Sequence, residues 1–173
     1  EIAQCLVGSE MCIRDSLYYD PNFRQAHAHE AIHVMPTVLE NFEFADIVRG
    51  SDEDFYNLFK LTDLDRVYQD HVQFYCDNFL TTRGANGVDL RTSRFTSHID
   101  AQSIQPVSTI GAGDNFNAGI IYGLLKYEVR KQDLPTLDKD KWLKIIQCGI
   151  DFSAEVCQSY DNYISSDFAC RYH

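Results

Sequence analysis

The sequence predicts an α/β fold: a twisted, mostly parallel sheet with helices on both faces. Short apolar runs have the length and composition of buried strands, at 17–19, 44–49 and 79–82. Longer segments carry apolar residues at helical spacing, at 63–75, 114–127 and 139–159. Strands that alternate with such helices are typical of sheets with helices packed on each face.

Composition and charge narrow the class of protein. The chain has 173 residues, which suits one domain, and 45% of them are hydrophobic. A formal net charge of −11 argues against a nucleic-acid partner, because phosphate backbones attract basic proteins. No apolar run has the length of a membrane span, so we expect no membrane partner. The six cysteines form no C-x-x-C pair, which favours reduced thiols and a cytoplasmic location.

Residues 1–16 do not fit the pattern of the rest of the chain. The run CLVGSEMCIRDS resembles peptides that arise when adaptor DNA is translated. We therefore interpret 1–16 as a non-native or disordered stretch and leave it out of the fold prediction. The alternative is an ordinary irregular N-terminus.

A short strand at 17–19 runs into the sequence Asp20-Pro21-Asn22-Phe23-Arg24. Pro21 ends strand pairing and holds Asp20 extended, as at the carboxyl end of a parallel strand. Ligands of doubly wound sheets bind beyond these ends, so this segment is expected near a site. Further along, Pro36 is expected to begin a new helix, because proline is favoured in a first turn.

The segment 108–119 is the best candidate for chemistry. Residues 104–107 are expected to end a strand, and a buried helix is expected to begin near Asp114. Between them, Gly111, Ala112 and Gly113 leave the backbone N–H groups accessible to an anion at the helix N-terminus. Asp114 then has two interpretations, a helix N-cap or a general base that takes a proton from an attacking hydroxyl.

This segment, STIGAGDNFNAG, resembles the D-T-x-G-A-G-D signature of ribokinase-like (PfkB) carbohydrate kinases. The resemblance implies that Asp114 is the catalytic base and that Gly111, Ala112 and Gly113 form the anion hole for the transferred phosphate. It also implies ATP and Mg²⁺ as cofactors. Ser108 stands where the signature has its first Asp, and this leaves open any monovalent-cation site built on that carboxylate.

The resemblance extends to other segments. D-P-N-x-R implies that Arg24 reaches the substrate, and the alternative is a surface arginine paired with an acid. Asn86-Gly87 alone predicts a hairpin. Within the resemblance, Thr82, Gly84 and Gly87 match the T-x-G-x-x-G loop that lies along the nucleotide. The same resemblance places 156–160 near the adenine and Asn162 at the edge of its pocket.

An acidic turn follows the strand at 44–49. In the family this strand precedes an N-x-x-E element near magnesium and phosphate, and Ser51 and Asp54 stand at those two positions. Asp54 is therefore a candidate for a metal-linked role. The alternative is a capped, solvated turn at the start of a helix, for which serine and acids are well suited.

His29-Glu30-Ala31-Ile32-His33 matches the H-E-x-x-H pattern of zinc hydrolases. A catalytic zinc needs a third protein ligand, and the flank at 24–28 is polar where a metalloprotease helix would be buried. We favour two histidines on a surface helix.

Together, these patterns predict ATP-dependent phosphorylation of a sugar hydroxyl by the intact enzyme. Residues 17–173 would be the C-terminal part of a ribokinase-like kinase domain, an N-terminally truncated fragment that is inactive by itself. The expected partners are ATP and a small-molecule sugar, and the resemblance leaves a homodimer open for the longer protein. Two alternatives stay open: a phosphate- or nucleotide-binding module without turnover, and a zinc hydrolase that uses the HEAIH run.

Overall fold

The computed structural model describes residues 16–172, and within this range the chain builds a five-stranded sheet in the order β1-β2-β3-β4-β5. Its strands are β1 (Tyr18–Tyr19), β2 (Ile47–Ser51), β3 (Phe79–Thr82), β4 (Val88–Arg91) and β5 (Thr96–Ile99). The pairs β1–β2 and β2–β3 are parallel, whereas β4 and β5 join antiparallel. The interpretation of 1–16 concerns residues that, apart from Ser16, lie outside the described range.

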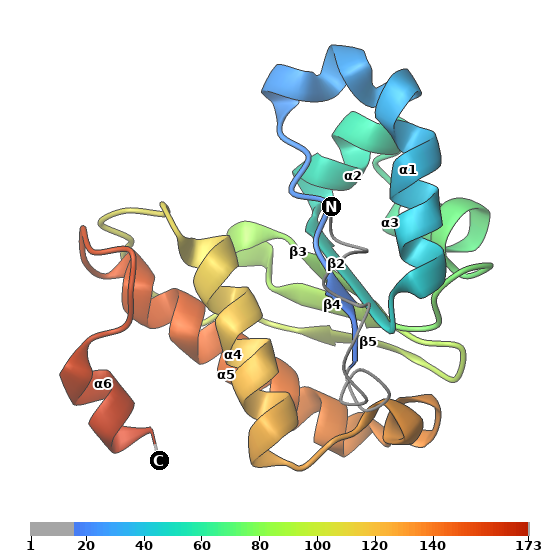
Figure 1. Ribbon diagram of the computed structural model, residues 1–173. Coiled ribbons are helices and arrows are strands. Elements are labelled where there is room, and N and C mark those ends of the chain that lie inside the picture. Colours follow the sequence, from blue (N-terminus) through green and yellow to red (C-terminus); the bar gives the residue numbers. More distant parts are fainter. Residues whose placement is uncertain (1–15, 173) are drawn as a thin grey trace, which may run out of the picture.

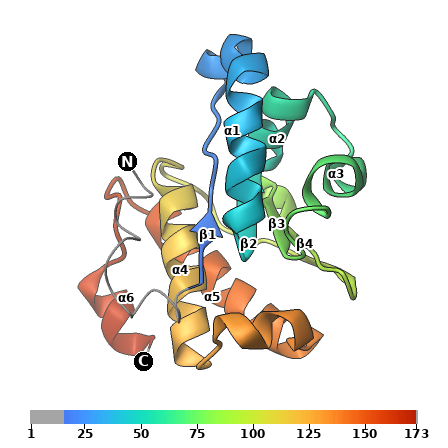
Figure 2. The ribbon, with the colours of Figure 1, turned by 45° about the vertical axis from the view of Figure 1, so that its right-hand side comes forward.

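Helices cover both faces of this sheet, which confirms the predicted fold class (Figures 1 and 2). On one side lie η3 (Gln25–Glu30), α1 (Ala31–Phe44), α2 (Asp52–Phe59), α3 (Leu64–Val67) and the π-helical turn η4 (Tyr68–Val72). On the other lie α4 (Ala112–Lys126), η6 (Lys131–Thr136) and α5 (Lys139–Cys157), followed by α6 (Ser166–Arg171). Within 16–172, no helix has both the length and the apolar character that crossing a bilayer requires.

Strand alternation explains the two cores. Val48 of β2 and Phe79 of β3 belong to the core under α1–α3, and both are fully buried. Their neighbours Ile47 and Leu80 point to the opposite face and join the core under α4 and α5. Because successive strand residues face opposite sides, a strand covered on both faces appears in the sequence as a continuous apolar run.

The helix expected to begin at Pro36 in fact begins at Ala31, so this prediction is wrong. Pro36 lies inside α1, where it cannot donate the usual hydrogen bond to Ile32. Ile32 is 77% exposed, so the missing hydrogen bond lies on the solvent side of α1. The apolar stripe of Ala31, Val38 and Phe42 continues through the proline, and its burial outweighs the lost bond.

The strand end expected at 104–107 is also absent, since no residue from 100 to 107 pairs with the described sheet. Instead, the backbone N–H groups of Val107 and Ser108 donate to the carbonyl of Cys157, at 2.8 and 3.3 Å. These bonds attach the segment before α4 to the C-terminal end of α5. The residues before α4 are therefore anchored to α5 and not to a strand.

α4 and α5 pack at very short range through glycines. A Cβ atom at Gly119 would overlap the carbonyl oxygen of Cys148 and come within 2.7 Å of the Cα atom of Gly149. A Cβ atom at Gly149 would in turn lie 2.8 Å from the Phe116 ring. Both clashes at Gly119 are with backbone atoms, which cannot rotate away. The absence of side chains at this contact therefore sets the distance of α4 from α5.

We predict that Gly119→Ala destabilises the protein by about 2–3 kcal/mol, the cost of overpacking a close contact. In an unconstrained helix the same change would stabilise by roughly 0.5–1 kcal/mol, because glycine is a poor helix former. Urea denaturation measures the difference. Gly123→Ala is the matched comparison, with a smaller loss, since its Cβ would come no closer than 3.0 Å to Ile145. A Gly119→Ala protein as stable as the wild type would contradict the packing.

Candidate active site

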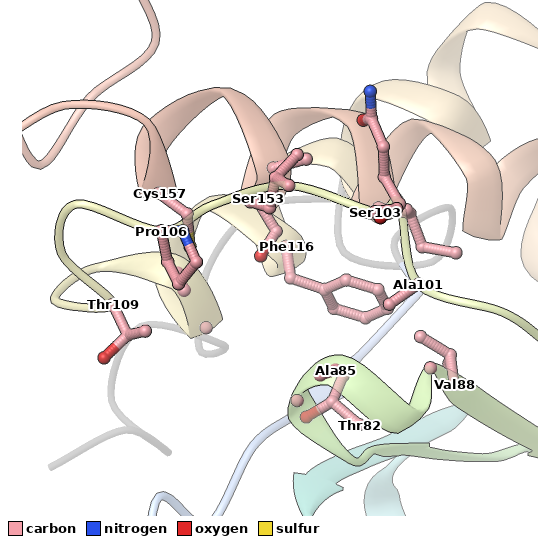
Figure 3. A pocket seen from close by; sticks show the side chains of 18 of the residues that line it. Thr82, Ala85, Val88, Ala101, Ser103, Pro106, Thr109, Phe116, Ser153 and Cys157 are labelled. Carbon is pink, nitrogen blue, oxygen red and sulfur yellow. The ribbon is translucent and has the colours of Figure 1, made fainter.

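A pocket of about 450 Å³ opens beside the first turn of α4 (Figure 3). Its walls come from the β3–β4 loop, the segment 101–109, the start of α4 and the last turns of α5. Figure 3 shows Ala85 and Val88 on one side of this pocket and Ser153 and Cys157 on the other. Much of the lining is apolar, which suits a flat heterocycle.

The first turn of α4 presents open backbone donors. Gly111 is the N-cap residue, with a φ of 78° that favours glycine, and no side chain caps the helix. The N–H of Ala112 donates to Thr109 O at 3.2 Å, and that of Asn115 donates to Gly111 O at 3.0 Å. Residues 16–172 offer no such acceptor to the N–H groups of Gly113 and Asp114. These two amides are therefore the donors available to an anion.

Asp114 is the third residue of α4, and its side chain is exposed. Within the described residues its carboxylate accepts no hydrogen bond from the helix, so the N-cap interpretation of the sequence is wrong. The cap position belongs to Gly111. The carboxylate is thus accessible beside the two open amides, where it could take a proton from a bound hydroxyl.

A buried arginine lies behind this turn. Arg49, on β2, is only 6% exposed and lines the pocket. Its Nη1 donates to Asp20 Oδ2 at 2.6 Å and its Nη2 donates to Thr82 Oγ1 at 2.8 Å. The guanidinium carbon lies 5.3 Å from the centre of the Phe116 ring, a cation–π distance. Arg49 therefore connects the carboxyl ends of β1, β2 and β3 with α4.

The network continues into the second turn of α4. Asn117 donates through Nδ2 to Asp20 Oδ2 at 2.8 Å, and its Oδ1 accepts from the Tyr18 hydroxyl at 3.0 Å. Burial raises the pKa of Tyr18 far above its usual value, so the phenol stays protonated and keeps donating. Asp20 also accepts from the N–H of Asn22 at 3.0 Å. The carboxylate of Asp20 thus accepts from β2, from α4 and from its own loop.

Three of the residues predicted to bind nucleotide, Thr82, Gly84 and Gly87, line this pocket from the β3–β4 loop. Of the predicted anion hole and base, Ala112 and Gly113 line it from the start of α4, whereas Gly111 and Asp114 are not among the lining residues. Gly87 has a φ of 88°, and a Cβ there would overlap the carbonyl oxygen of Ile99, so the loop requires glycine. Of the range 156–160, Cys157 lines the pocket.

Asn162 is not among the residues that line the pocket, and it contacts the turn at 111–115 instead. Asn115 donates through Nδ2 to the carbonyls of both Gly111 and Asn162, at 3.0 and 2.9 Å. A Cβ atom at Gly111 would lie 3.3 Å from the Asn162 Cβ. Asn162 therefore stabilises the turn at Gly111 through its backbone carbonyl and its Cβ contact.

Arg24 and Asp54 are not brought to the pocket. Arg24 is exposed, and its Nε donates to Asn22 Oδ1 at 3.5 Å. Asp54 forms a capping box with Ser51: its Oδ2 accepts from the Ser51 backbone N–H at 2.8 Å, and Ser51 Oγ accepts from the Asp54 N–H at 3.1 Å. The structure therefore places Asp54 in the capping box in which Ser51 is the N-cap of α2, and its metal-linked role stays a prediction.

The HEAIH run lies at the junction of η3 and α1, on the surface. His29 is 74% exposed in its side chain and lies 3.5 Å from Glu30. Among residues 16–172, no group of three His, Cys, Asp or Glu side chains is placed to hold a metal ion. The described chain thus supplies no third ligand for a zinc site at His29 and His33.

Sequence reasoning missed Arg49 and the contributions of Ser153 and Ala154 to the pocket. A signal for Arg49 was available, because a basic residue directly after the buried pair Ile47 and Val48 needs a specific partner. Ser153 and Ala154 gave no such signal, since small residues on a core helix have many roles.

A scan against family models matches residues 9–167 to the pfkB family carbohydrate kinases. The chain belongs to this family. It is 30% identical over 112 residues to a fructokinase of Vibrio alginolyticus, and covers 36% of that protein. It is 33% identical over 107 residues to the probable fructokinase-6, chloroplastic, of Arabidopsis thaliana, and covers 28% of it. Those matches take in 63% and 61% of this chain.

Solved kinases share the fold. The aminoimidazole riboside kinase of Salmonella enterica, complexed with aminoimidazole riboside and an ATP analogue, superposes with a TM-score of 0.74 at 18% identity. The match covers 90% of this chain and 51% of that one. The fructokinase of Xylella fastidiosa with bound ATP gives 0.73 at 18% identity, covering 88% and 48%. The chain therefore spans about half the length of these structures.

We predict that Gly113→Val weakens ATP binding by about 5-fold or more, as expected for about 1–3 kcal/mol of overpacking. A Cβ at Gly113 would lie 3.4 Å from both Nη atoms of Arg49, an ordinary contact, so the added methyl groups must displace Arg49 or enter the pocket. Titration calorimetry on the complete protein measures the affinity. Gly113→Ala is the matched control and should bind almost normally. Unchanged affinity in a folded Gly113→Val protein would show that this turn does not approach the nucleotide.

Proposed function

We propose that the complete protein phosphorylates a sugar hydroxyl with ATP, and that this chain supplies the C-terminal, nucleotide-binding part of the kinase domain. Asp114 is the base, and the N–H groups of Gly113 and Asp114 hold the transferred phosphoryl group. The observation that carries the proposal is the exposed Asp114 carboxylate in the first turn of α4, directly after Ala112 and Gly113, which line the pocket, and beside two open helix-terminal amides.

The pocket supports a nucleotide as the donor. Between the β3–β4 loop and α5 it is lined by apolar residues such as Ala85, Val88 and Ile150, which suits adenine, and the buried Arg49 lines it beside Gly113 of α4. Thr82, Gly84 and Gly87 are proposed to lie along the nucleotide. Asn162 acts by supporting Gly111. The amide of Ala112 already has an acceptor, so its contribution is to the shape of the loop.

We propose that the nucleotide would be bound as its Mg²⁺ complex, in which the ion would supply charge neutralisation at the phosphates. Magnesium keeps several waters and needs few protein ligands, so the lack of a three-ligand cluster within 16–172 is compatible with it. Asp54 is the candidate on the protein side: its Oδ2 takes part in the capping box of α2, and its Oδ1 accepts no hydrogen bond from the described residues. Arg24 remains a candidate for the sugar side.

The names of the relatives suggest where to look for the acceptor. Fructose is the first candidate, because the curated relatives are fructokinases, and a riboside is the second. A cytoplasmic location remains part of the proposal. It is supported by the free thiols of Cys76, Cys148, Cys157 and Cys170, of which Cys76 has its pKa raised by burial to about 11.

We predict that Asp114→Asn in the complete protein lowers kcat about 10²- to 10⁴-fold, the usual range for a lost general base, with little change in ATP affinity. A coupled assay of ADP formation measures kcat against a panel of hexoses, pentoses and ribosides. Asp140→Asn is the matched control, an acid in the first turn of α5 at the end away from the pocket, and should retain activity. A full rate in Asp114→Asn would contradict the role of Asp114. ATP binding without turnover in the wild type would favour the non-catalytic module.

We also predict that residues 1–173 alone form no sugar-dependent ADP. The described residues supply the base, the amides and the pocket, whereas the one sugar-side candidate, Arg24, is exposed and away from the pocket. A base removes a proton efficiently only from a hydroxyl that is held in line with the phosphate. The same assay on the isolated chain tests this. Sugar-dependent ADP formation that Asp114→Asn abolishes would show that the sugar site lies within this chain.

A further inference from the structure

The start of α4 has no capping side chain at its N-cap position. Its N-cap residue, Gly111, has no side chain to bond the first turn. Helices without a capping side chain begin less sharply and fray more easily. The base of the proposed reaction lies in this first turn, so its position must be determined by contacts from other elements.

Arg49 makes or relays three contacts to this part of α4. Its Nη atoms would lie 3.4 Å from a Cβ at Gly113, so the guanidinium packs directly against that turn. Its guanidinium carbon lies 5.3 Å from the Phe116 ring centre. Through Asp20 Oδ2, which accepts from both Arg49 and Asn117, it holds the next position. These contacts bracket Asp114 on both sides along the helix.

We propose that Arg49 is a positioning residue for phosphoryl transfer: it fixes the first two turns of α4, and with them Asp114 and the open amides, against the ends of β1, β2 and β3. This inference rests on the proposed function of Asp114. Arg49 acts through geometry more than through net charge, because Asp20 already neutralises it at 2.6 Å. A displacement of a reacting group by about 1 Å can cost roughly 10²-fold in rate.

Position 49 requires the two Nη groups of a guanidinium. Two nitrogens reach Asp20 and Thr82 at once, at 2.6 and 2.8 Å, from a side chain that is almost fully buried. A lysine has the charge but only one ammonium group, so it can retain the pair with Asp20 while losing Thr82. Methionine fills similar space with neither contact.

The experiment compares Arg49→Met and Arg49→Lys with Arg91→Met in the complete protein. Arg91 is the matched control, an equally buried arginine on β4 that pairs with Asp65 at 2.6 Å and does not line the pocket. After correction for the folded fraction, Arg49→Met should lower kcat about 10- to 100-fold, with a smaller change in KM for ATP. Arg49→Lys should recover part of this loss. Arg91→Met should lower the melting temperature and leave kcat unchanged.

Two further measurements keep the test decisive. Hydrogen exchange of the amides at 113–118 should accelerate in Arg49→Met and not in Arg91→Met. Asn117→Ala breaks the same link from the side of α4. The Arg49→Met/Asn117→Ala double variant should therefore have a kcat only slightly below that of the less active single variant. If Arg49→Met fails to fold, Arg49→Lys and Asn117→Ala carry the same test.

The outcomes separate this inference from the proposed function. If the wild type transfers phosphate and Asp114→Asn does not, equal kcat values in Arg49→Met and Arg91→Met would overturn the role of Arg49. Additive losses in the double variant would also overturn it. If no acceptor is phosphorylated, the proposed function fails, and unchanged exchange at 113–118 in Arg49→Met would then overturn the inference by itself.

Discussion

The ion pair between Arg49 and Asp20 is the interaction on which the site depends. Both groups leave water, with side-chain exposures of 7% and 16%, and burial of two charges is repaid only by close geometry and further hydrogen bonds. Thr82 and Asn117 provide those bonds. Loss of one member of such a pair typically costs about 3–5 kcal/mol, because the other charge stays buried. Three strands and one helix therefore have to meet in one arrangement.

The glycine contact between α4 and α5 restrains the same helix from the opposite side. Gly119 and Gly149 let the two backbones approach, and Phe116 packs over Gly149 while its ring also faces Arg49. The polar network thus limits the rotation and rise of α4, and the apolar contact limits its distance from the core. Between these restraints the first turn projects into the pocket with Asp114 exposed. The exposed Asp114 is thus held by residues that are buried or half-buried.

Sequence reasoning grouped candidate residues best where they are contiguous. The glycines and the carboxylate of 111–114 lie together at the start of α4, and Thr82, Gly84 and Gly87 lie within one hairpin. The Arg49 network could not be derived in this way, because its hydrogen bonds join residues that are far apart in the sequence. Arg49 is 29 positions from Asp20 and 33 from Thr82, and Asn117 is 97 positions from Asp20. Local rules also failed where packing outweighed them. Pro36 predicts a helix start, yet burial of Ala31, Val38 and Phe42 carries the helix through it.

The charge of the protein and the chemistry of the site are compatible because they act over different distances. A net charge of −11 repels a long polyanion, but at physiological salt this field is screened within about 8–10 Å, whereas helix-terminal amides act at contact. Asp114 adds a negative charge beside the proposed phosphate, which weakens ground-state binding. In the proposed reaction it accepts the hydroxyl proton and becomes neutral as charge develops on the phosphoryl group. The repulsion therefore falls on the way to the transition state, which lowers the barrier selectively.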